Sequence, residues 1–514
     1  MPEKYHIKTR PVPPRRPRLG KHGVVDWRED CARCHNCVKK ACVYDRYAQE
    51  VDYIRKLTEV EALYFDCMGC FSCVQDCTKG LLCLSVNPVY EKLGNSYWKP
   101  DIIKTTWLQA ETAKIPVSGA GYRGPFSGHG FDSMWTDMSE IVRPTRDGIH
   151  GREYISTSVD LGAKPMRLEF GADGAVKNGA ALLELQMPVI LEAAPWGDPS
   201  GAFLEARISA AAALRTLAVV PAKHLQAVTE EQRRFVVPLF ESGEALPPKD
   251  ALSQVRMVEI ADGPSGFSLA KELQGDDRRL LVAVRMPLRP GAAKRVLELH
   301  QSGISLIHLC ADYHGREWHG QVPLPAREER GTGSQQQTKA ARGITERPRF
   351  VKDVLREIHG ALVQRGLRDA VTLIASGGIA LPEHVAKAII CGADLVGVDI
   401  PLLVALGCRV CAGRHKAACP ANIAEAEADY AAQRMVNLMG AWHSQLIEVL
   451  GAMGLREIRR LRGEAGRAMF QEDLERDAFK DLARGLEGAA EVAEPDRQPV
   501  LSEPKEQAVL GIHR

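Results

Sequence analysis

Short apolar runs alternate with amphipathic segments along the second half of the chain. From residue 188 onward, each apolar run is followed by a stretch in which helical period or turn residues dominate. Helical period is clearest over residues 202–214, 292–301, 350–365 and 382–391. The apolar runs predict strands over residues 188–192, 216–220, 235–240, 255–260, 280–285, 304–309, 371–375 and 395–398. Eight alternations within about 220 residues favour an α/β fold, a closed (β/α)8 TIM barrel.

A doubly wound parallel sheet is the competing fold, because it also alternates strands with helices. One long polar segment, residues 312–345, separates the sixth and seventh predicted strands and includes three consecutive glutamines. In a barrel this segment lies on the catalytic rim. A loop of this length is usually a lid, a partner-binding segment or partly disordered.

Composition divides the chain into five parts. A basic tail rich in Pro and Arg, predicted to be disordered or a docking arm, is followed by a cysteine-rich ferredoxin-like domain, a connector with little periodic pattern, the barrel, and a helical end with an acidic tail. The predicted boundaries are residues 1–21, 22–95, 96–180, 181–470 and 471–514.

Nine of the fourteen cysteines lie between Cys31 and Cys83. Eight of them form two runs, one of Cys31, Cys34, Cys37 and Cys42 and one of Cys67, Cys70, Cys73 and Cys77. Three thiolates at this spacing can hold one iron–sulfur cube while the fourth reaches a second cube. The runs therefore predict two [4Fe-4S] clusters.

Both runs depart from the bacterial ferredoxin pattern. Four residues, rather than three, separate Cys37 from Cys42, and Val43 and Thr78 stand where that pattern has proline. Structural zinc and disulfides are the alternatives, since paired CxxC units also suit tetrahedral zinc. Zinc rarely needs three cysteines at this tight triple spacing, which favours clusters.

Charge and hydropathy limit the classes of partner. The chain of 514 residues has 67 basic and 65 acidic residues, a net charge of +2, which gives no sign of a nucleic-acid or membrane partner. No stretch approaches the roughly 18 apolar residues of a membrane-spanning helix. The basic tail lacks the apolar core of a signal peptide. Oxygen-sensitive clusters favour a reducing compartment, and we expect a cytoplasmic location.

A paired-glycine turn follows the seventh predicted strand. Barrel enzymes often hold a phosphate with the loops after strands seven and eight, and Ser376, Gly377 and Gly378 occupy the first of these positions. Paired glycines allow positive φ and let backbone amides approach an anion. Most glycine pairs are merely turns. FMN is the cofactor that suits both this turn and iron–sulfur clusters, since flavins convert single electrons to two-electron chemistry.

Three segments carry a resemblance to a family. Residues 374–408, with IASGGI and AKAIICGADLVGVDIPLLVALGC, resemble the FMN-binding synthase domain of glutamate synthases, particularly the short archaeal type. Residues 122–162, with WTDMSEIVRPTRDGIHGREYIS, and residues 430–461 are similar to the entry and end of such proteins. The resemblance implies a (β/α)8 barrel with FMN and a [3Fe-4S] cluster that reduces iminoglutarate formed from 2-oxoglutarate and ammonia. An amino-terminal ferredoxin unit is known in such relatives.

The resemblance implies roles for residues around a flavin. Ser376, Gly377 and Gly378 match the family's FMN phosphate turn, whereas Asp399 and Ile400 replace its second, Gly-Thr turn. At the end of the fifth strand, Arg285 stands where the family usually has a lysine near the flavin ring. Arg285 either stabilises reduced flavin or merely seals the barrel mouth. Trp196 and Gly197 keep the aromatic and glycine positions of a turn packed along the flavin.

The resemblance also implies a substrate loop and a third cluster. Asp312 and His314 stand in place of a Gly-rich segment after the sixth strand, as proton carriers or simply as polar rim residues. Cys408 and Cys419 fit [3Fe-4S] ligands, with Arg414 at the middle ligand position. Cys411 is the substitute ligand, and loss of the cluster is the alternative.

These features predict an iron–sulfur flavoprotein oxidoreductase that passes electrons to FMN for reductive amination of a 2-oxo acid. Two alternatives remain: a non-catalytic electron-transfer subunit with a diverged FMN barrel, and a docking scaffold without FMN. No GxGxxG motif follows a predicted strand, so we expect electrons from a redox partner protein. The expected substrates are a 2-oxo acid and an amine, and the expected nitrogen source is free ammonia or an amidotransferase subunit.

Overall fold

The structure is a computed structural model. It describes residues 5–15, 19–25, 70–80, 84–115, 128–136, 155–165, 167–177, 179, 181–241, 243–244, 249–264, 266, 269–270, 272–273, 280–318, 348–411 and 421–479. The chain forms two compact units, Met1–Ala468 and Met469–Arg514, and the fold described below belongs to the first.

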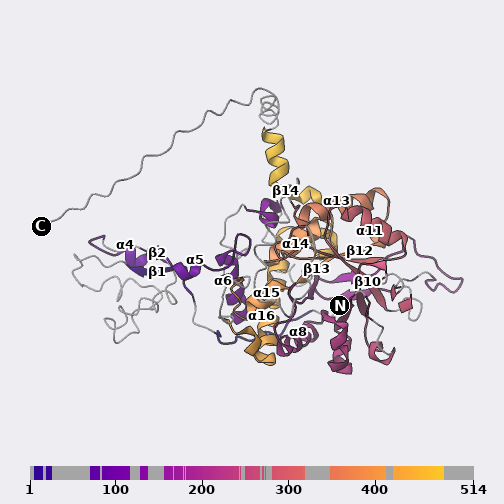
Figure 1. Cartoon of the computed structure of the whole chain (residues 1–514). Helices are drawn as coiled ribbons and strands as arrows, with labels where there is room; N and C mark the ends of the chain where they lie inside the picture. Colours follow the sequence, from indigo (N-terminus) through magenta and orange to yellow (C-terminus); the bar gives the residue numbers. More distant parts are fainter. Residues whose placement is uncertain are drawn as a thin grey trace, which may run out of the picture. The chain divides into compact units, whose positions relative to one another are not determined.

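Eight parallel strands form a closed barrel at the centre of this unit (Figure 1). The strands are neighbours in the order β10, β11, β12, β13, β6, β7, β8 and β9. Their bounds are β6 Val189–Leu191, β7 Ala218–Pro221, β8 Val236–Phe240, β9 Met257–Ala261, β10 Leu281–Pro287, β11 Leu306–Cys310, β12 Thr372–Ser376 and β13 Leu395–Val398. Each strand overlaps a predicted apolar run. Closure confirms the predicted barrel and excludes the doubly wound sheet, which stays open.

Two of the helices around the barrel begin with ordinary local signals. The Ser200 side chain accepts a hydrogen bond from the Phe203 amide at 3.2 Å and so caps α8, Gly201–Ala213. Pro382 occupies the first turn of α14, where its missing N–H costs nothing. The other described helices are α4 Ser72–Gln75, α5 Pro88–Glu91, α6 Pro100–Thr112, α9 Glu230–Arg233, α11 Ala292–Gln301, α13 Val351–Gln364, α15 Ile400–Ala405 and α16 Ala428–Ala452.

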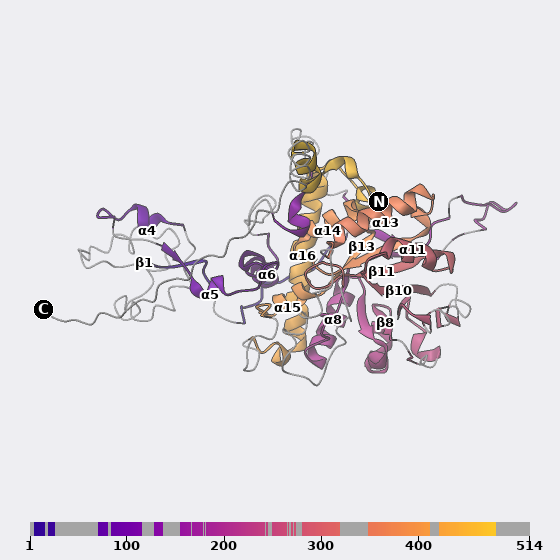
Figure 2. The same ribbon diagram turned by 45° about the horizontal axis from the view of Figure 1, so that its top comes forward.

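The longest described helix, α16, packs on the outer helices of the barrel. Figure 2 shows it beside α6 and α8, and it also packs against α14 and α15. Its buried face includes Trp442, which is fully buried and donates a hydrogen bond to Gln109 of α6 at 3.2 Å. The sequence predicts a helical segment over residues 425–461, which includes the whole of α16, but only a connector with little periodic pattern where α6 lies. The connector thus contains a helix that was not predicted, and Ile102 and Ile103 of α6 are buried in the same helical layer.

Residues 5–15 dock on the outer helices. The Tyr5 hydroxyl donates to the Leu214 carbonyl at 2.6 Å, and the Val12 amide donates to the Glu111 carbonyl at 3.0 Å. The Asn437 side chain of α16 donates to the Arg10 carbonyl at 2.8 Å. Of the two predictions for the basic tail, these residues therefore follow the docking arm.

Short two-stranded sheets complete the described fold. β1, His22–Val25, pairs antiparallel with β2, Leu84–Val86, so the sheet joins the two ends of the cysteine-rich segment. β4, Val159–Leu161, pairs antiparallel with β5, Leu183–Leu185. The remaining short strands are β3 Met134–Thr136 and β14 Ala468–Phe470. Within the described ranges, each helix is too short or too polar to span a membrane.

Candidate active site

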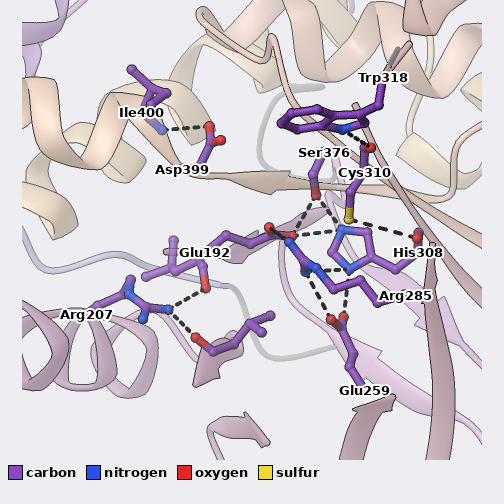
Figure 3. A network of polar contacts seen from close by, with 12 residues as sticks. Glu192, Arg207, Glu259, Arg285, His308, Cys310, Trp318, Ser376, Asp399 and Ile400 are labelled. Carbon is purple, nitrogen blue, oxygen red and sulfur yellow. Dashed lines mark hydrogen bonds and ion pairs between the residues drawn. The ribbon is translucent and has the colours of Figure 1, made fainter. Parts of the chain in front are cut away.

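Five polar residues meet inside the barrel, near the carboxyl ends of its strands (Figure 3). Glu192 directly follows β6, Glu259 lies in β9, Arg285 in β10 and His308 in β11, and Ser376 ends β12. The Glu259 and His308 side chains have no exposed surface, whereas Arg285 keeps 23% of its side chain exposed. We call these five residues the barrel network.

Two carboxylates and two cations of the barrel network alternate. Arg285 donates from Nη2 to Glu192 Oε2 at 2.7 Å and from Nη1 to Glu259 Oε2 at 3.1 Å. His308 places Nδ1 2.7 Å from Glu259 Oε1 and Nε2 2.8 Å from Glu192 Oε1. Its Nε2 also contacts Ser376 Oγ, which donates to Glu192 Oε1 at 2.6 Å. Every charge is thus paired, as buried charges require.

The barrel network keeps all four groups charged. Burial alone lowers the pKa of His308, but the nearby Cys310 sulfur and the two carboxylates raise that pKa well above its ordinary value. Burial alone raises the pKa of Glu192, but Arg285 and His308 bring it well below its ordinary value. The pKa of Glu259 is lowered in the same way, against burial, by His308 and Arg285. The four charges therefore sum to zero.

Ser376, His308 and Glu259 lie in the order of a serine-hydrolase triad, but each ring nitrogen of His308 faces a carboxylate, Nδ1 that of Glu259 and Nε2 that of Glu192. A charged histidine donates from both ring nitrogens and has no lone pair to take the serine proton. The Ser376 hydroxyl already donates a hydrogen bond to Glu192. The arrangement is a buried ion network rather than a nucleophile with its base.

Gly397 leaves room for the barrel network. A Cβ on Gly397 would lie 2.1 Å from Glu192 Oε1 and 2.3 Å from Ser376 Oγ. Both distances are below any real carbon–oxygen contact, so a side chain at this position would displace Glu192 or Ser376.

The paired glycines after β12 have the predicted backbone. Gly377 has φ +92° and Gly378 has φ +71°, which confirms the expected positive values. A Cβ on Gly377 would lie 2.5 Å from the Asp312 carbonyl, and one on Gly378 would lie 2.6 Å from the Gly315 Cα. The glycines therefore also let the loops after β11 and β12 pack closely.

The amides of this turn fit an anion. Gly377, Gly378 and Ile379 are buried, and no described residue accepts a hydrogen bond from their N–H groups. Buried backbone donors are otherwise nearly always paired, and a run of free N–H groups is typical of phosphate sites. The Ser376 side chain points into the barrel network, so only the backbone of the turn is open to an anion.

Asp399 occupies an amide in the neighbouring loop after β13. Its Oδ1 accepts the Ile400 amide at 2.6 Å, so the first amide of α15 is already bonded. Burial, with a smaller contribution from the Glu192 carboxylate, raises the pKa of Asp399 to about 7. An ionised carboxylate here repels a phosphate, whereas a protonated one does not.

The predicted flavin-packing turn follows β6. Gly197 has φ +87° and donates to the Ala194 carbonyl at 2.8 Å. Trp196 is 49% exposed, and its ring lies edge-on to Tyr313 with 6.1 Å between centroids. Arg207 of α8 fixes this turn by donating to Asp198 Oδ2 at 2.6 Å.

Asp312 and His314 lie on the loop after β11, and Asp312 shapes that loop. Its Oδ1 accepts the amides of His314 at 2.9 Å and Arg316 at 2.7 Å. The His314 Nδ1 lies 3.9 Å from Asp312 Oδ2. Burial raises the pKa of Asp312 and lowers that of His314. The geometry supports the polar-rim alternative, and proton transfer by either residue stays a prediction.

Sequence reasoning missed Glu192, Glu259 and His308 as members of one site. A signal was present, because each is an ionisable residue within a mostly apolar predicted strand. It also missed the connector residues Tyr97 and Trp98. The Tyr97 hydroxyl donates to the Gly378 carbonyl, and the Trp98 indole donates to the Tyr313 carbonyl at 2.8 Å.

The described cysteines lie on two segments. Cys73 lies in α4, with Cys70 before that helix and Cys77 after it, and these three are exposed or half-buried. Cys408 and Cys411 are half-buried. The Val410 amide donates to Cys408 Sγ at 3.4 Å, and Val410 has φ +49°, an unusual value for a β-branched residue. Within the described ranges, no three His, Cys, Asp or Glu residues form a group that could hold a metal. Arg414 and the remaining proposed ligands, Cys31, Cys34, Cys37, Cys42, Cys67 and Cys419, lie outside the described residues.

Comparisons with known proteins agree with the resemblance in the sequence. Residues 330–456 match the family described as the conserved region in glutamate synthase. The matched region thus spans the end of the long loop, β12, β13 and the whole of α16.

Similarity to curated glutamate synthases extends over most of the chain. The archaeal-type glutamate synthase (NADPH) of Dehalococcoides mccartyi is 25% identical over 475 residues, which cover 86% of this chain and 93% of that one. The archaeal glutamate synthase (NADPH) of Archaeoglobus fulgidus is 25% identical over 513 residues, covering 91% and 97%. Among solved structures, the flavin-binding domain of baker's yeast flavocytochrome b2 is 12% identical with a TM-score of 0.35, covering 81% of this chain and 89% of that one.

Proposed function

We propose that this chain is an iron–sulfur flavoprotein oxidoreductase of the glutamate synthase type. In this proposal two [4Fe-4S] clusters pass electrons to FMN, and the barrel carries out reductive amination of a 2-oxo acid. The observation that carries the proposal is the turn after β12, whose buried amides have no described acceptor. The turn lies in the region of the chain that matches the glutamate synthase family.

The residues at the barrel rim fit FMN in part. The amides of Gly377, Gly378 and Ile379 would hold the phosphate, and Trp196 and Gly197 would lie along the ring system. Arg285, the partly exposed cation of the barrel network, would stabilise negative charge on reduced flavin. When bound, FMN supplies the conversion of single electrons into two-electron chemistry.

Cysteine chemistry supports the iron–sulfur part of the proposal. The two runs would hold the two [4Fe-4S] clusters, and Cys70, Cys73 and Cys77 of the second run are exposed or half-buried. A [3Fe-4S] cluster would use Cys408, Cys411 and Cys419. In its support, the Val410 amide donates to Cys408 Sγ from a strained left-handed backbone, and such strain clusters at functional sites. Hydrogen bonds to ligand sulfurs also tune cluster potentials.

A second candidate function is a non-catalytic electron-transfer subunit with the same cofactors. Asp399 favours it, because its carboxylate takes the Ile400 amide at the loop where a second phosphate contact would form. Asp312 favours it too, because its Oδ1 is engaged by two amides of its own loop. Under either function, we propose that a separate redox protein supplies electrons. Nitrogen would come from ammonia or an amidotransferase subunit.

Product formation separates the two functions. Anaerobically purified full-length protein, reduced by a viologen, should form glutamate from 2-oxoglutarate and ammonia if it is an enzyme. The matched control replaces Arg285 with Lys, which keeps one charge but loses the two-pronged contact with Glu192 and Glu259. If viologen reduces the flavin but no glutamate forms at saturating substrate, the result would favour the electron-transfer subunit.

A further inference from the structure

A short segment between the cysteine-rich region and α6 lies across the barrel rim. We call residues 94–98 the strap. The Gly94 amide donates to the Arg409 carbonyl at 3.0 Å, and Asn95 Oδ1 accepts the amides of Tyr97 and Trp98, each at 2.9 Å. A Cβ on Gly94 would lie 1.7 Å from the Trp98 carbonyl oxygen. The strap is thus a tight turn that requires glycine at its start.

The strap bonds to two loops at the carboxyl end of the barrel. The Tyr97 hydroxyl donates to the Gly378 carbonyl, in the turn after β12. Trp98 has no exposed surface, and its indole donates to the Tyr313 carbonyl at 2.8 Å, in the loop after β11. The Tyr97 ring packs beside Phe350, with 6.0 Å between centroids. These contacts hold the two loops at fixed positions relative to the strap.

The hydrogen bond from Tyr97 affects the Ile379 amide, which would face the phosphate. The Gly378 carbonyl and the Ile379 N–H belong to one planar peptide unit, so a hydrogen bond at the oxygen fixes the direction of the N–H. Accepting that bond also polarises the peptide and strengthens its donor. Burial, with the carboxylates of Asp132, Asp312 and Asp399, raises the pKa of Tyr97 well above its ordinary value. The hydroxyl therefore keeps its proton and donates.

We propose that Tyr97 is a positioning residue for FMN binding, which couples the strap to the turn after β12. The inference rests on the proposed function, because FMN is the ligand of that turn. Coupling between two sites is reciprocal: Tyr97 strengthens FMN binding, and bound FMN stabilises the docked strap. The chain leaving the cysteine-rich region is thereby held to the rim most firmly when flavin is present.

The test compares Tyr97→Phe with the matched control Tyr90→Phe in the full-length chain. Tyr90 lies on α5 and its hydroxyl donates to Asp101, so the control also removes one tyrosine hydrogen bond, but away from the turn. FMN is titrated into each apoprotein and binding is followed by quenching of flavin fluorescence. Tyr97→Phe should bind FMN about threefold to tenfold more weakly than the wild type, the effect of one hydrogen bond. Tyr90→Phe should bind as the wild type does.

Hydrogen exchange gives a second readout, and its first part uses the wild type alone. In the wild type, saturating FMN should slow exchange at the strap amides of Tyr97 and Trp98, and Tyr97→Phe should lose this protection. Wild-type protein that binds FMN without protecting the strap, or a Tyr97→Phe chain with unchanged affinity, would overturn the inference and leave the proposed function standing. Failure of the wild type to bind FMN would overturn both.

Discussion

Arg285 and Glu192 form an ion pair of 2.7 Å inside the barrel, and Glu192 is 3% exposed there. The pair links β10 to the end of β6, two strands that are not neighbours in the sheet. Charged side chains thus fill a space that apolar layers occupy in an ordinary barrel of this kind.

Replacing Arg285 with Met should strongly destabilise the chain. The change leaves Glu192 and Glu259 buried with His308 as their remaining cation, and removal of one member of a buried ion pair costs about 3–5 kcal/mol. Urea denaturation measures the loss. Arg295→Met is the matched control, because Arg295 is 34% exposed and pairs with Asp262 near the surface, where such pairs contribute about 0–1 kcal/mol. Equal losses for the two variants would contradict the account of the barrel network.

The stability of the wild type should fall as the solution becomes alkaline. The folded pKa of His308 is raised above the unfolded value of about 6.5, so its contribution is complete below that value and declines toward the folded pKa. One such proton changes the free energy of unfolding by at most about 1.4 kcal/mol per pH unit. Urea midpoints at pH 8, 9 and 10 test this, above the range where Asp399 titrates.

The control for that experiment is His308→Gln, which keeps a polar side chain but cannot carry the proton. We expect a lower stability at every pH and a shallower decline between pH 8 and 10. A decline as steep as that of the wild type would show that His308 is not the titrating group.

Asp399 should make FMN binding weaker at higher pH. The pKa of Asp399 is raised to about 7, so the carboxyl is mostly neutral at pH 6 and mostly charged at pH 8, beside the turn proposed to hold the phosphate. In Asp399→Asn the side-chain oxygen can still cap the Ile400 amide, but the charge is absent. Titrations with FMN at pH 6, 7 and 8 should show a steeper loss of affinity for the wild type than for Asp399→Asn. If the affinities of the wild type and of Asp399→Asn fell equally with pH, the pH dependence would come from FMN itself.

Gly397→Ala should disturb the barrel network directly. Its new methyl group would overlap Glu192 Oε1, and overpacking of this kind costs about 1–3 kcal/mol. Gly360→Ala is the control, since a Cβ there meets no atom within 4 Å and Gly360 lies inside α13. The control should be neutral or stabilising by up to about 1 kcal/mol. Thermal unfolding of both variants decides the point, and a stable Gly397→Ala chain would contradict the observed packing.

The barrel could be predicted from sequence because its strands are buried on both sides. Residues 373–375 before Ser376 and residues 395–398 before Asp399 are continuously apolar, which is the pattern of a parallel strand covered by helices. The helix α6 escaped prediction because its buried face mixes Ile102 and Ile103 with Thr106, Gln109 and Glu111. Its polar buried residues weaken the helical period.

The candidate site was predictable only where one local motif forms it. The positive φ of Gly377 and Gly378 follows from a glycine pair at a strand end. The barrel network needs Glu192 and His308, more than a hundred residues apart, to meet through closure of the barrel. The contact between Tyr97 and Gly378 spans 281 residues and has no local signal.

The most direct test of the central claim is cofactor analysis of full-length protein purified without oxygen. We predict a flavin absorption spectrum, release of about one FMN per chain, and about eight irons with matching sulfide, or about eleven if Cys408, Cys411 and Cys419 hold a third cluster. A colourless chain that takes up neither iron nor FMN on anaerobic reconstitution would contradict it.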